Sequence, residues 1–131
     1  MIRKSVQTHP DVEPAETTGI EPTLFIRIKF GERAFIGPGK TELLELIDEH
    51  GSISAAGRAM GMSYRRAWMI IDGLNSAFHS PLVTKQTGGS GGGGAVLTEL
   101  GREVVTRYRQ IEKNAAENSA ADLKALSKYM S

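Results

Sequence analysis

The chain has 131 residues and a formal net charge of +1, from 16 basic and 15 acidic side chains. Its 40% hydrophobic and 24% charged composition is typical of one soluble domain, and no run approaches the roughly 20 apolar residues of a membrane span. The absence of cysteine excludes disulfides, thiolate zinc sites and thiol nucleophiles. The chain opens without an apolar signal-peptide core, so we expect a cytoplasmic protein.

The near-zero total charge hides an uneven distribution along the chain. Residues 1–51 have a balance of −3, residues 52–94 a balance of +3, and residues 95–131 a balance of +1. The basic residues of the middle segment are Arg58, Arg65, Arg66 and Lys85. Four charges are few, so chance grouping is one explanation. The other is a basic surface for an acidic partner such as nucleic acid, which the average charge alone argues against.

The first third of the chain predicts a tail, a hairpin and a helix. Residues 1–22 are rich in Pro, Glu and Thr and have little to bury, which favours a flexible tail. Alternating residues predict a strand over 24–30 with its even-numbered apolar side chains on one face, then a turn and a short return strand over 33–36. After the break at 37–39, we expect a helix of about a dozen residues that ends at Gly51.

Residues 53–72 fit a helix-turn-helix, a pair of short helices that cross at a steep angle. Close crossing needs small residues, and the tight turn needs a residue that tolerates a positive φ. The small residues and the apolar residues at the expected core offsets are Ile53, Ala56, Gly57, Met60, Gly61, Met62, Ala67 and Ile70. A generic helical hairpin with a glycine turn is the alternative, and the number of matches at fixed offsets favours the helix-turn-helix.

The second helix of this pair, roughly 64–78, is expected to carry contacts to DNA. A serine precedes each helix, so Ser52 or Ser54 can cap the first and Ser63 the second. In this motif the N-terminal part of the second helix enters the major groove. The residues expected to be exposed there are Ser63, Tyr64, Arg65, Arg66 and Met69. An arginine at this place can pair with guanine or with phosphate, a solvated charged face being the alternative, and Trp68 is more simply a packing residue.

A strand, a glycine loop and a returning strand follow. The strands are expected at 82–86 and 95–98, and residues 87–94 hold six glycines in eight residues. A linker would need a second domain after it, and a nucleotide-phosphate loop would need Lys-Ser or Lys-Thr directly after the glycines. A hairpin tip along a DNA backbone fits better, because amides without a Cβ atom can approach phosphates closely. The expected contacts of this wing are Lys85, Thr87, Gly88, Gly89, Ser90 and Gly91.

Three blocks of the sequence, at 51–56, 62–68 and 87–98, resemble the DNA-binding domain of the ModE family of molybdate-responsive regulators. The resemblance covers about residues 23–112, and the chain is also weakly similar to the LysR-type winged helix, whose wing lacks the glycine run. It implies a homodimer on a palindromic operator. Family members sense molybdate through a separate C-terminal region, so molybdate or another oxyanion effector is not expected to bind within this chain.

The last part of the chain predicts a helix that starts at Thr98, is interrupted at 114–119 and continues over 120–130. Its apolar residues recur at helical spacing. The residues expected at the dimer contact are Val104, Tyr108, Ile111, Leu123 and Leu126. Packing inside the monomer is the alternative, although little remains in the monomer to cover the distal part.

Two other kinds of site find weaker support. Residues 34–41 fit a relaxed Walker A pattern, but Pro38 removes an amide donor, and the remaining chain offers neither a parallel sheet nor a carboxylate for magnesium. The three histidines are scattered, and no Asp or Glu stands at a metal-ligand spacing from them. We therefore expect no catalytic residue, no metal and no cofactor.

Together these features predict a mainly α fold with small β hairpins (α+β), a winged helix-turn-helix with an N-terminal hairpin and a C-terminal dimerisation helix. The expected domains are the tail at 1–22, the DNA-binding domain at 23–112 and a helical extension at 113–131. The expected function is that of a bacterial-type transcriptional repressor. It would bind double-stranded DNA as a homodimer through a recognition helix at about 63–78 and a wing at about 82–98. A winged-helix module for protein partners is the alternative.

Overall fold

The computed structural model describes residues 20–86 and 93–131. The chain divides into two compact units, of which one is Phe25–Glu112. The other contains Lys113–Ser131 and, among the described N-terminal residues, those up to Leu24. Most of the tail expected at 1–22 lies outside the described residues. Within the described ranges, every helix is too short or too polar to span a lipid bilayer.

Short helices and two small hairpins make up the chain. In chain order the elements are β1 (Ile28–Phe30), β2 (Ala34–Ile36), α1 (Pro38–His50), α2 (Ile53–Ala59), α3 (Tyr64–Ala77), β3 (Val83–Gln86), β4 (Gly94–Leu97), α4 (Glu99–Asn118) and α5 (Ala120–Lys128). β1 with β2, and β3 with β4, form separate two-stranded antiparallel sheets. The expected winged helix-turn-helix of the α+β class is confirmed.

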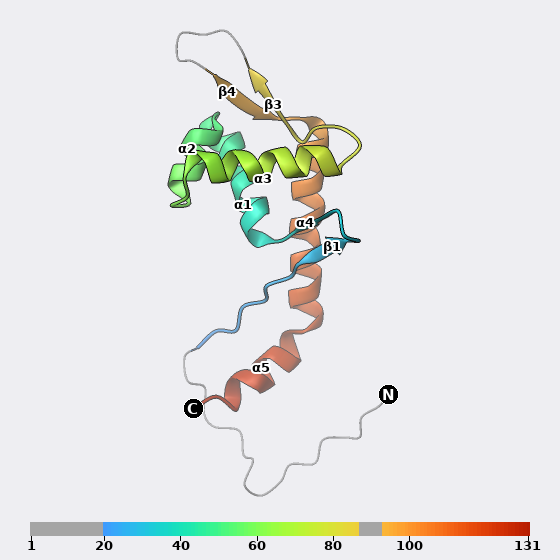
Figure 1. Cartoon of the computed structure of the whole chain (residues 1–131). Helices are drawn as coiled ribbons and strands as arrows, with labels where there is room; N and C mark the ends of the chain where they lie inside the picture. The colour runs from blue at the N-terminus through green and yellow to red at the C-terminus, as the bar shows by residue number, and fades with distance from the viewer. Residues whose placement is uncertain (1–19, 87–92) are drawn as a thin grey trace, which may run out of the picture. The chain divides into compact units, whose positions relative to one another are not determined.

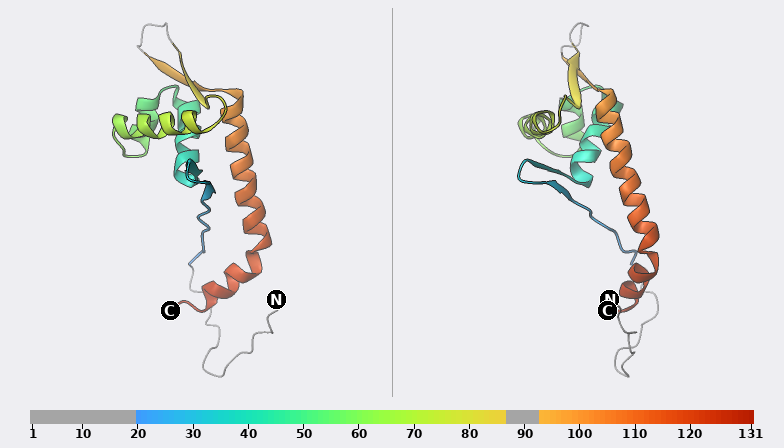
Figure 2. Two further views of the ribbon diagram at one scale, coloured as in Figure 1. Left: turned by 45° about the vertical axis from the view of Figure 1, so that its right-hand side comes forward. Right: turned by 90° about the vertical axis from the view of Figure 1, so that its right-hand side faces the viewer.

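In the unit Phe25–Glu112, α3 lies in front of α1 with a hairpin on each side (Figure 1). The β3–β4 hairpin lies above α3 in that view and the β1–β2 hairpin below it, and the views of Figure 2 show the same order. One apolar core joins these elements. Its buried side chains are Ile36, Leu43, Leu44, Ile47, Ile53, Ala56, Ala67, Ile71, Leu74, Leu82, Val83, Ala95, Leu97 and Tyr108.

The first hairpin is shorter than the sequence predicts. β1 covers only Ile28–Phe30 of the expected strand at 24–30. The antiparallel pairing stops at Ile36 on the partner strand. It goes no further because Gly37 and Pro38 follow at once and turn the chain into α1, in which Pro38 is the first residue.

Two large aromatic side chains of this unit are exposed. Phe30, on the apolar face predicted for its strand, is 44% exposed and meets Phe78 edge-on, with ring centroids 5.8 Å apart. The packing role favoured for Trp68 is wrong, because this side chain is 39% exposed. Ala67 and Ile71 supply the buried face of α3. Trp68, about 100° further round the helix from Ala67, therefore points towards its surface.

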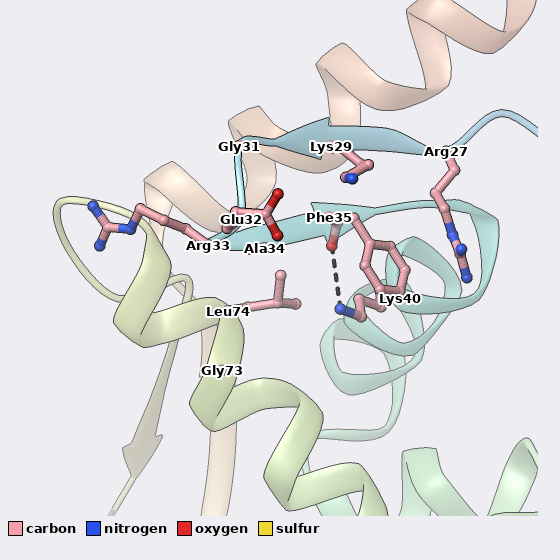
Figure 3. Close-up of a pocket in the computed structure, with 10 residues that line it drawn as sticks. All are labelled: Arg27, Lys29, Gly31, Glu32, Arg33, Ala34, Phe35, Lys40, Gly73 and Leu74. Atoms are coloured by element: carbon pink, nitrogen blue, oxygen red, sulfur yellow. Dashed lines mark hydrogen bonds between the residues drawn. The ribbon is translucent and has the colours of Figure 1, made fainter.

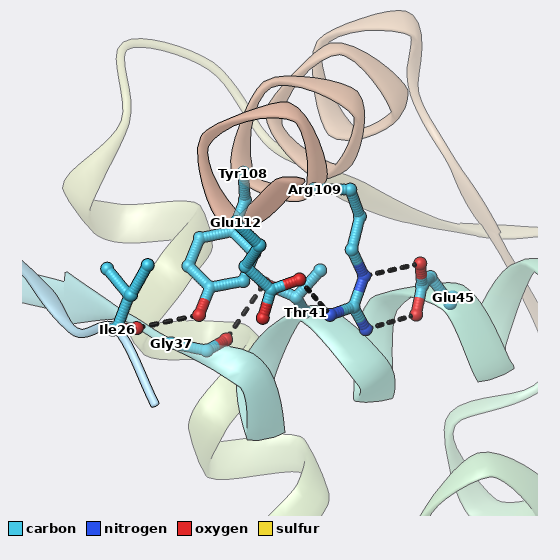
Figure 4. A network of polar contacts seen from close by, with 7 residues as sticks. All are labelled: Ile26, Gly37, Thr41, Glu45, Tyr108, Arg109 and Glu112. Atoms are coloured by element: carbon cyan, nitrogen blue, oxygen red, sulfur yellow. Dashed lines mark hydrogen bonds and ion pairs between the residues drawn. The ribbon is translucent and has the colours of Figure 1, made fainter. Parts of the chain in front are cut away.

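Tyr108 corrects the expected dimer contact. Its side chain is 2% exposed, and its hydroxyl donates a hydrogen bond to the Ile26 carbonyl at 2.6 Å (Figure 4). Burial raises the pKa of this hydroxyl, and the Glu112 carboxylate raises it further. The segment around Ile26 thus covers this face of α4, so Tyr108 is used within the monomer and is not available to a second copy.

Arg109, the next residue of α4, fastens that helix to α1. Its guanidinium donates to both carboxylate oxygens of Glu45, at 2.7 and 3.0 Å, and to Glu112 at 2.7 Å (Figure 4). The hydrogen bonds that Glu45 and Glu112 accept from Arg109 raise the pKa of this guanidinium above its already high ordinary value. This two-oxygen pairing fixes how α4 lies against α1, because it sets both a distance and an orientation.

The interruption expected at 114–119 is confined to one residue. α4 continues to Asn118, and α5 begins at Ala120 after Ser119. Within the unit that contains this region, the Ser127 hydroxyl donates to the Ile20 carbonyl at 3.0 Å. Leu126 of α5 is 62% exposed.

Candidate nucleic-acid interface

The crossing of α2 and α3 depends on two glycines, as the sequence predicts. A Cβ atom built on Gly57 would lie 3.0 Å from the Cβ of Ala67, tighter than ordinary contact, so a larger residue would push the two helices apart by a few tenths of an ångström. Gly61 has a φ of +73° in the turn, a conformation that L side chains rarely adopt. Of the candidate capping serines, Ser52 caps α2 by accepting a hydrogen bond from the Ala55 amide at 2.9 Å.

The predicted contact residues gather around the start of α3. Ser63 caps this helix, with its hydroxyl accepting from the Arg66 amide at 3.1 Å. Tyr64 and Met69 are 52% and 57% exposed, and Arg65 is exposed as well. The first turns of α3 therefore expose both polar and apolar side chains to solvent, starting with Ser63 and the two arginines.

Helical spacing divides the exposed part of α3 into sides. At about 100° per residue, Arg65 and Met69 point away from the core. Tyr64 and Trp68 lie on one side of this line, and Arg66 and Gly73 on the other. The residues of α3 thus form a central strip with two flanks, the arrangement of a helix that presents its outer face to a groove.

Asn75 positions the β3–β4 hairpin against α3. Its Oδ1 accepts from the amides of Leu82 and Val83, at 2.8 and 3.2 Å, and its Nδ2 donates to the Val83 carbonyl at 3.0 Å. One side chain thereby satisfies three backbone groups at the start of β3. The hairpin is held to the same helix that carries the arginines.

The far strand of this hairpin is held by two further elements. The Ala95 amide of β4 donates to the Gly51 carbonyl at the end of α1, at 2.9 Å. Thr98 donates from its hydroxyl to the Pro81 carbonyl at 2.8 Å and caps α4 by accepting from the Gly101 amide at 2.9 Å. A Cβ on Gly101 would collide with the Leu82 carbonyl, so the close packing of α4 against the start of β3 requires glycine.

The structure describes one of the predicted wing contacts, Lys85, which lies exposed on β3. The other expected wing contacts lie outside the described residues: Thr87, Gly88, Gly89, Ser90 and Gly91. The strands on either side of them, β3 and β4, pair from Val83 opposite Leu97 to Gln86 opposite Gly94.

The Walker-like residues are engaged in local structure. Lys40 donates to the Phe35 carbonyl at 3.2 Å, and the Thr41 hydroxyl donates to the Gly37 carbonyl at 2.8 Å within the first turn of α1. The strand before them belongs to a two-stranded antiparallel sheet. Across residues 20–86 and 93–131, no three His, Cys, Asp or Glu side chains come together as a metal ion would require.

Comparison with known proteins agrees with this geometry. Residues 40–102 match the family model described as bacterial regulatory helix-turn-helix protein, lysR family. This LysR-type region includes α2, α3 and the β3–β4 hairpin, so it coincides with the elements that make up the candidate interface.

Curated proteins similar to this chain include molybdenum-related regulators. The chain is 42% identical over 84 residues to the molybdenum-pterin-binding protein MopB of Rhodobacter capsulatus, covering 64% of this chain and 31% of that protein. It is 35% identical over 99 residues to the DNA-binding transcriptional dual regulator ModE of Escherichia coli K12, covering 73% of this chain and 38% of that protein. The resemblance to the ModE family is confirmed. The chain spans about a third of the length of the curated relatives it matches.

The residues that hold the LysR-type region together include several that sequence reasoning did not single out. Asn75 and Gly101 carry no motif, and their roles depend on Leu82, which lies opposite both in space. The sequence offered no signal for Asn75, because helical spacing places it on the same side of α3 as Tyr64 and Trp68. The cations of the first hairpin were also missed, because that part of the sequence has a negative balance.

Proposed function

We propose that this chain is a transcriptional regulator that binds duplex DNA, with α3 in the major groove and the β3–β4 hairpin beside it. The observation that carries the proposal is the exposed start of α3, where Arg65 and Arg66 lie next to the Ser63 cap in a LysR-type region. A helix of this kind fits the width of the major groove and reads base edges with its first turns. The relative in Escherichia coli is named a DNA-binding transcriptional regulator, which supports the same role.

The exposed residues divide into two proposed roles. Arg65 points outward from α3 and is suited to bidentate contact with guanine, while Met69 one turn on can touch thymine methyl groups. Ser63, Tyr64, Arg66 and Lys85 flank this strip and are suited to phosphate contacts. The glycine tip beyond Lys85 would approach the backbone through its amides.

The proposed regulator acts as a homodimer on a palindromic operator and represses transcription in the cytoplasm. A single helix and wing make few base contacts, and a second copy on the other half-site doubles their number. The remaining candidate dimer contacts are Val104, Ile111, Leu123 and Leu126. Ile111 is 42% exposed and Leu126 62% exposed, which leaves apolar surface for a second copy to cover. The names of two relatives refer to molybdenum. We propose no binding site for molybdate or another oxyanion effector among the described residues.

A module for protein partners is the second candidate. The observation in its favour is the apolar character of α3, on which Tyr64, Trp68 and Met69 are all at least 39% exposed. A partner helix or groove could cover such a strip. This candidate predicts no affinity for duplex DNA at any salt concentration.

The test compares Arg65→Ala with Arg107→Ala, which removes the same charge from an exposed position on α4. Fluorescence anisotropy measures binding to a labelled duplex from upstream of the protein's own coding region and to a scrambled duplex. If Arg65 reads a guanine, its variant loses about 1–3 kcal/mol on the specific duplex and much less on the scrambled one. Equal losses on both duplexes would refute the base-reading role, and the Arg107 variant should match the wild type.

A further inference from the structure

A second cationic surface lies on the other side of α3 from the β3–β4 hairpin. Between α3 and the β1–β2 hairpin is a cleft of about 420 Å³ (Figure 3). The cations that line it are Arg27, Lys29, Arg33 and Lys40. Glu32 is the one carboxylate that the described chain brings to this cleft, so its lining carries a net charge of about +3.

These four positive charges have no carboxylate partners among the described residues. The ion pairs of the described residues lie outside the cleft, and their basic partners are Arg102, Arg107 and Arg109. A protein surface that gathers like charges without counter-charges stores repulsion, which an anion bound between them would relieve.

Phe35 holds two of the cations in place. The Arg27 guanidinium lies 4.1 Å and the Lys40 ammonium 3.7 Å from the centre of its ring. Lys40 also donates to the Phe35 carbonyl at 3.2 Å, as the dashed line in Figure 3 marks. Burial lowers the pKa of Lys40, and the charge of Arg27 lowers it further. The two cations are therefore ordered before any ligand arrives, which reduces the entropy lost on binding.

Gly73 gives the cleft its open wall on α3. It lies in the interior of the helix, where glycine weakens a helix relative to alanine. A Cβ atom there would meet nothing within 4 Å, so packing does not require glycine at this position. Gly73 also lines the neighbouring hollow that contains Arg65 and Arg66, so the missing side chain leaves the cleft open towards these two arginines.

The position of the cleft beside α3 indicates which anion it binds. α3 lies between the two hairpins (Figure 2), and a major groove about 12 Å wide is bordered by a phosphate backbone on each side. We propose that the cleft between β1–β2 and α3 binds a phosphodiester of the DNA backbone, on the border of the groove opposite the β3–β4 hairpin. The proposal rests on the proposed function. Free phosphate has the same chemistry, so the experiment separates the two sources.

The experiment measures the salt dependence of duplex binding for the whole chain and four variants. Lys29→Ala and Arg33→Ala each remove an exposed cation of the cleft, Gly73→Leu fills the cleft without changing charge, and Arg107→Ala is the matched charge control. We expect the plot of log affinity against log salt to lose about 0.9 in slope for each cation removed. Gly73→Leu should weaken binding roughly threefold to tenfold by displacing one phosphate contact, with a thermal unfolding midpoint no lower than that of the wild type.

Three outcomes overturn the inference in distinguishable ways. Duplex binding with unchanged slopes in the Lys29 and Arg33 variants would overturn the cleft alone and leave the proposed function standing. Saturable binding of inorganic phosphate in calorimetry, lost in both variants while their duplex slopes stay unchanged, would assign the cleft to a free anion instead. A wild-type chain that binds no duplex at any salt concentration would overturn the inference and the proposed function together.

Discussion

The two hairpins that flank α3 differ in how they are held and in what they carry. Polar bonds from three helical regions fasten β3–β4, through Asn75 of α3, Gly51 at the end of α1 and Thr98 at the start of α4. The β1–β2 hairpin has two such bonds, from the Tyr108 hydroxyl to the Ile26 carbonyl just before it and from Lys40 to the Phe35 carbonyl, and cation–π contacts with Phe35 order its charges. The β3–β4 hairpin is held by more polar bonds and carries one described cation, and the β1–β2 hairpin with the residue before it is held by fewer and carries three.

Charge counted along a sequence can therefore miss a charged surface. The first 51 residues have a balance of −3, yet they contribute all four cations of the cleft. These cations stand between 27 and 40, where Glu32 is the single acidic residue. The carboxylates that reverse the balance come before and after this stretch, and folding removes Glu45 from the count by pairing it with Arg109.

The largest expected effect on stability is at the contact between α4 and the start of β3. Gly101→Ala should destabilise the fold by about 2–3 kcal/mol, because the new methyl group would overlap the Leu82 carbonyl and force α4 away from β3. Urea unfolding followed by circular dichroism measures this change. Gly39→Ala is the control, since a Cβ there meets nothing within 4 Å, and a loss as large as that of Gly101→Ala would contradict the steric explanation.

A smaller loss is expected when the polar link between α3 and β3 is removed. Asn75→Ala leaves two amides and a carbonyl of Leu82 and Val83 without their partner, which should cost about 1–2 kcal/mol of unfolding free energy. It should also weaken duplex binding, because the hairpin is no longer fixed beside the helix. Ser76→Ala changes the exposed neighbour and should do neither. Unaltered stability in the Asn75 variant would show that water replaces these bonds.

Tyr108→Phe tests the segment that leads into the β1–β2 hairpin. The Ile26 carbonyl loses its hydrogen-bond donor, so unfolding free energy should fall by about 1 kcal/mol at neutral pH. Burial raises the pKa of Tyr108 in the folded state, while the unfolded chain titrates near its ordinary value of about 10. The stabilisation is therefore complete below about pH 10 and is lost above it, so the difference between variant and wild type should shrink there. Tyr129→Phe, at a 51% exposed position, should show neither effect.

The smallest effect is expected for the cation of the better-fixed hairpin. Lys85→Ala should weaken binding to specific and scrambled duplexes alike and lower the salt slope by about one, as loss of a single phosphate contact does. Anisotropy titrations at several salt concentrations measure it. A loss confined to the specific duplex would instead make Lys85 a base-reading residue.

Much of the helix-turn-helix follows from local rules. Gly57, Gly61 and Ser63 have the roles that crossing, turn and cap demand, and these roles depend on a few neighbouring residues. Tyr108 and Trp68 could not be assigned in this way. Each is apolar at helical spacing, and whether it is covered depends on a distant segment, in one case the carbonyl of Ile26 82 positions earlier in the chain.

Duplex binding by the whole chain across a salt series tests the central claim most directly. A labelled duplex from upstream of the coding region, titrated between low and physiological salt, should give a log affinity that falls linearly with log salt. With contacts from α3 and both hairpins, the slope should be steeper than about −3, since each phosphate contact contributes about −0.9. Absence of binding at the lowest salt concentration, or an affinity that does not change with salt, would contradict the assignment of this chain as a DNA-binding regulator.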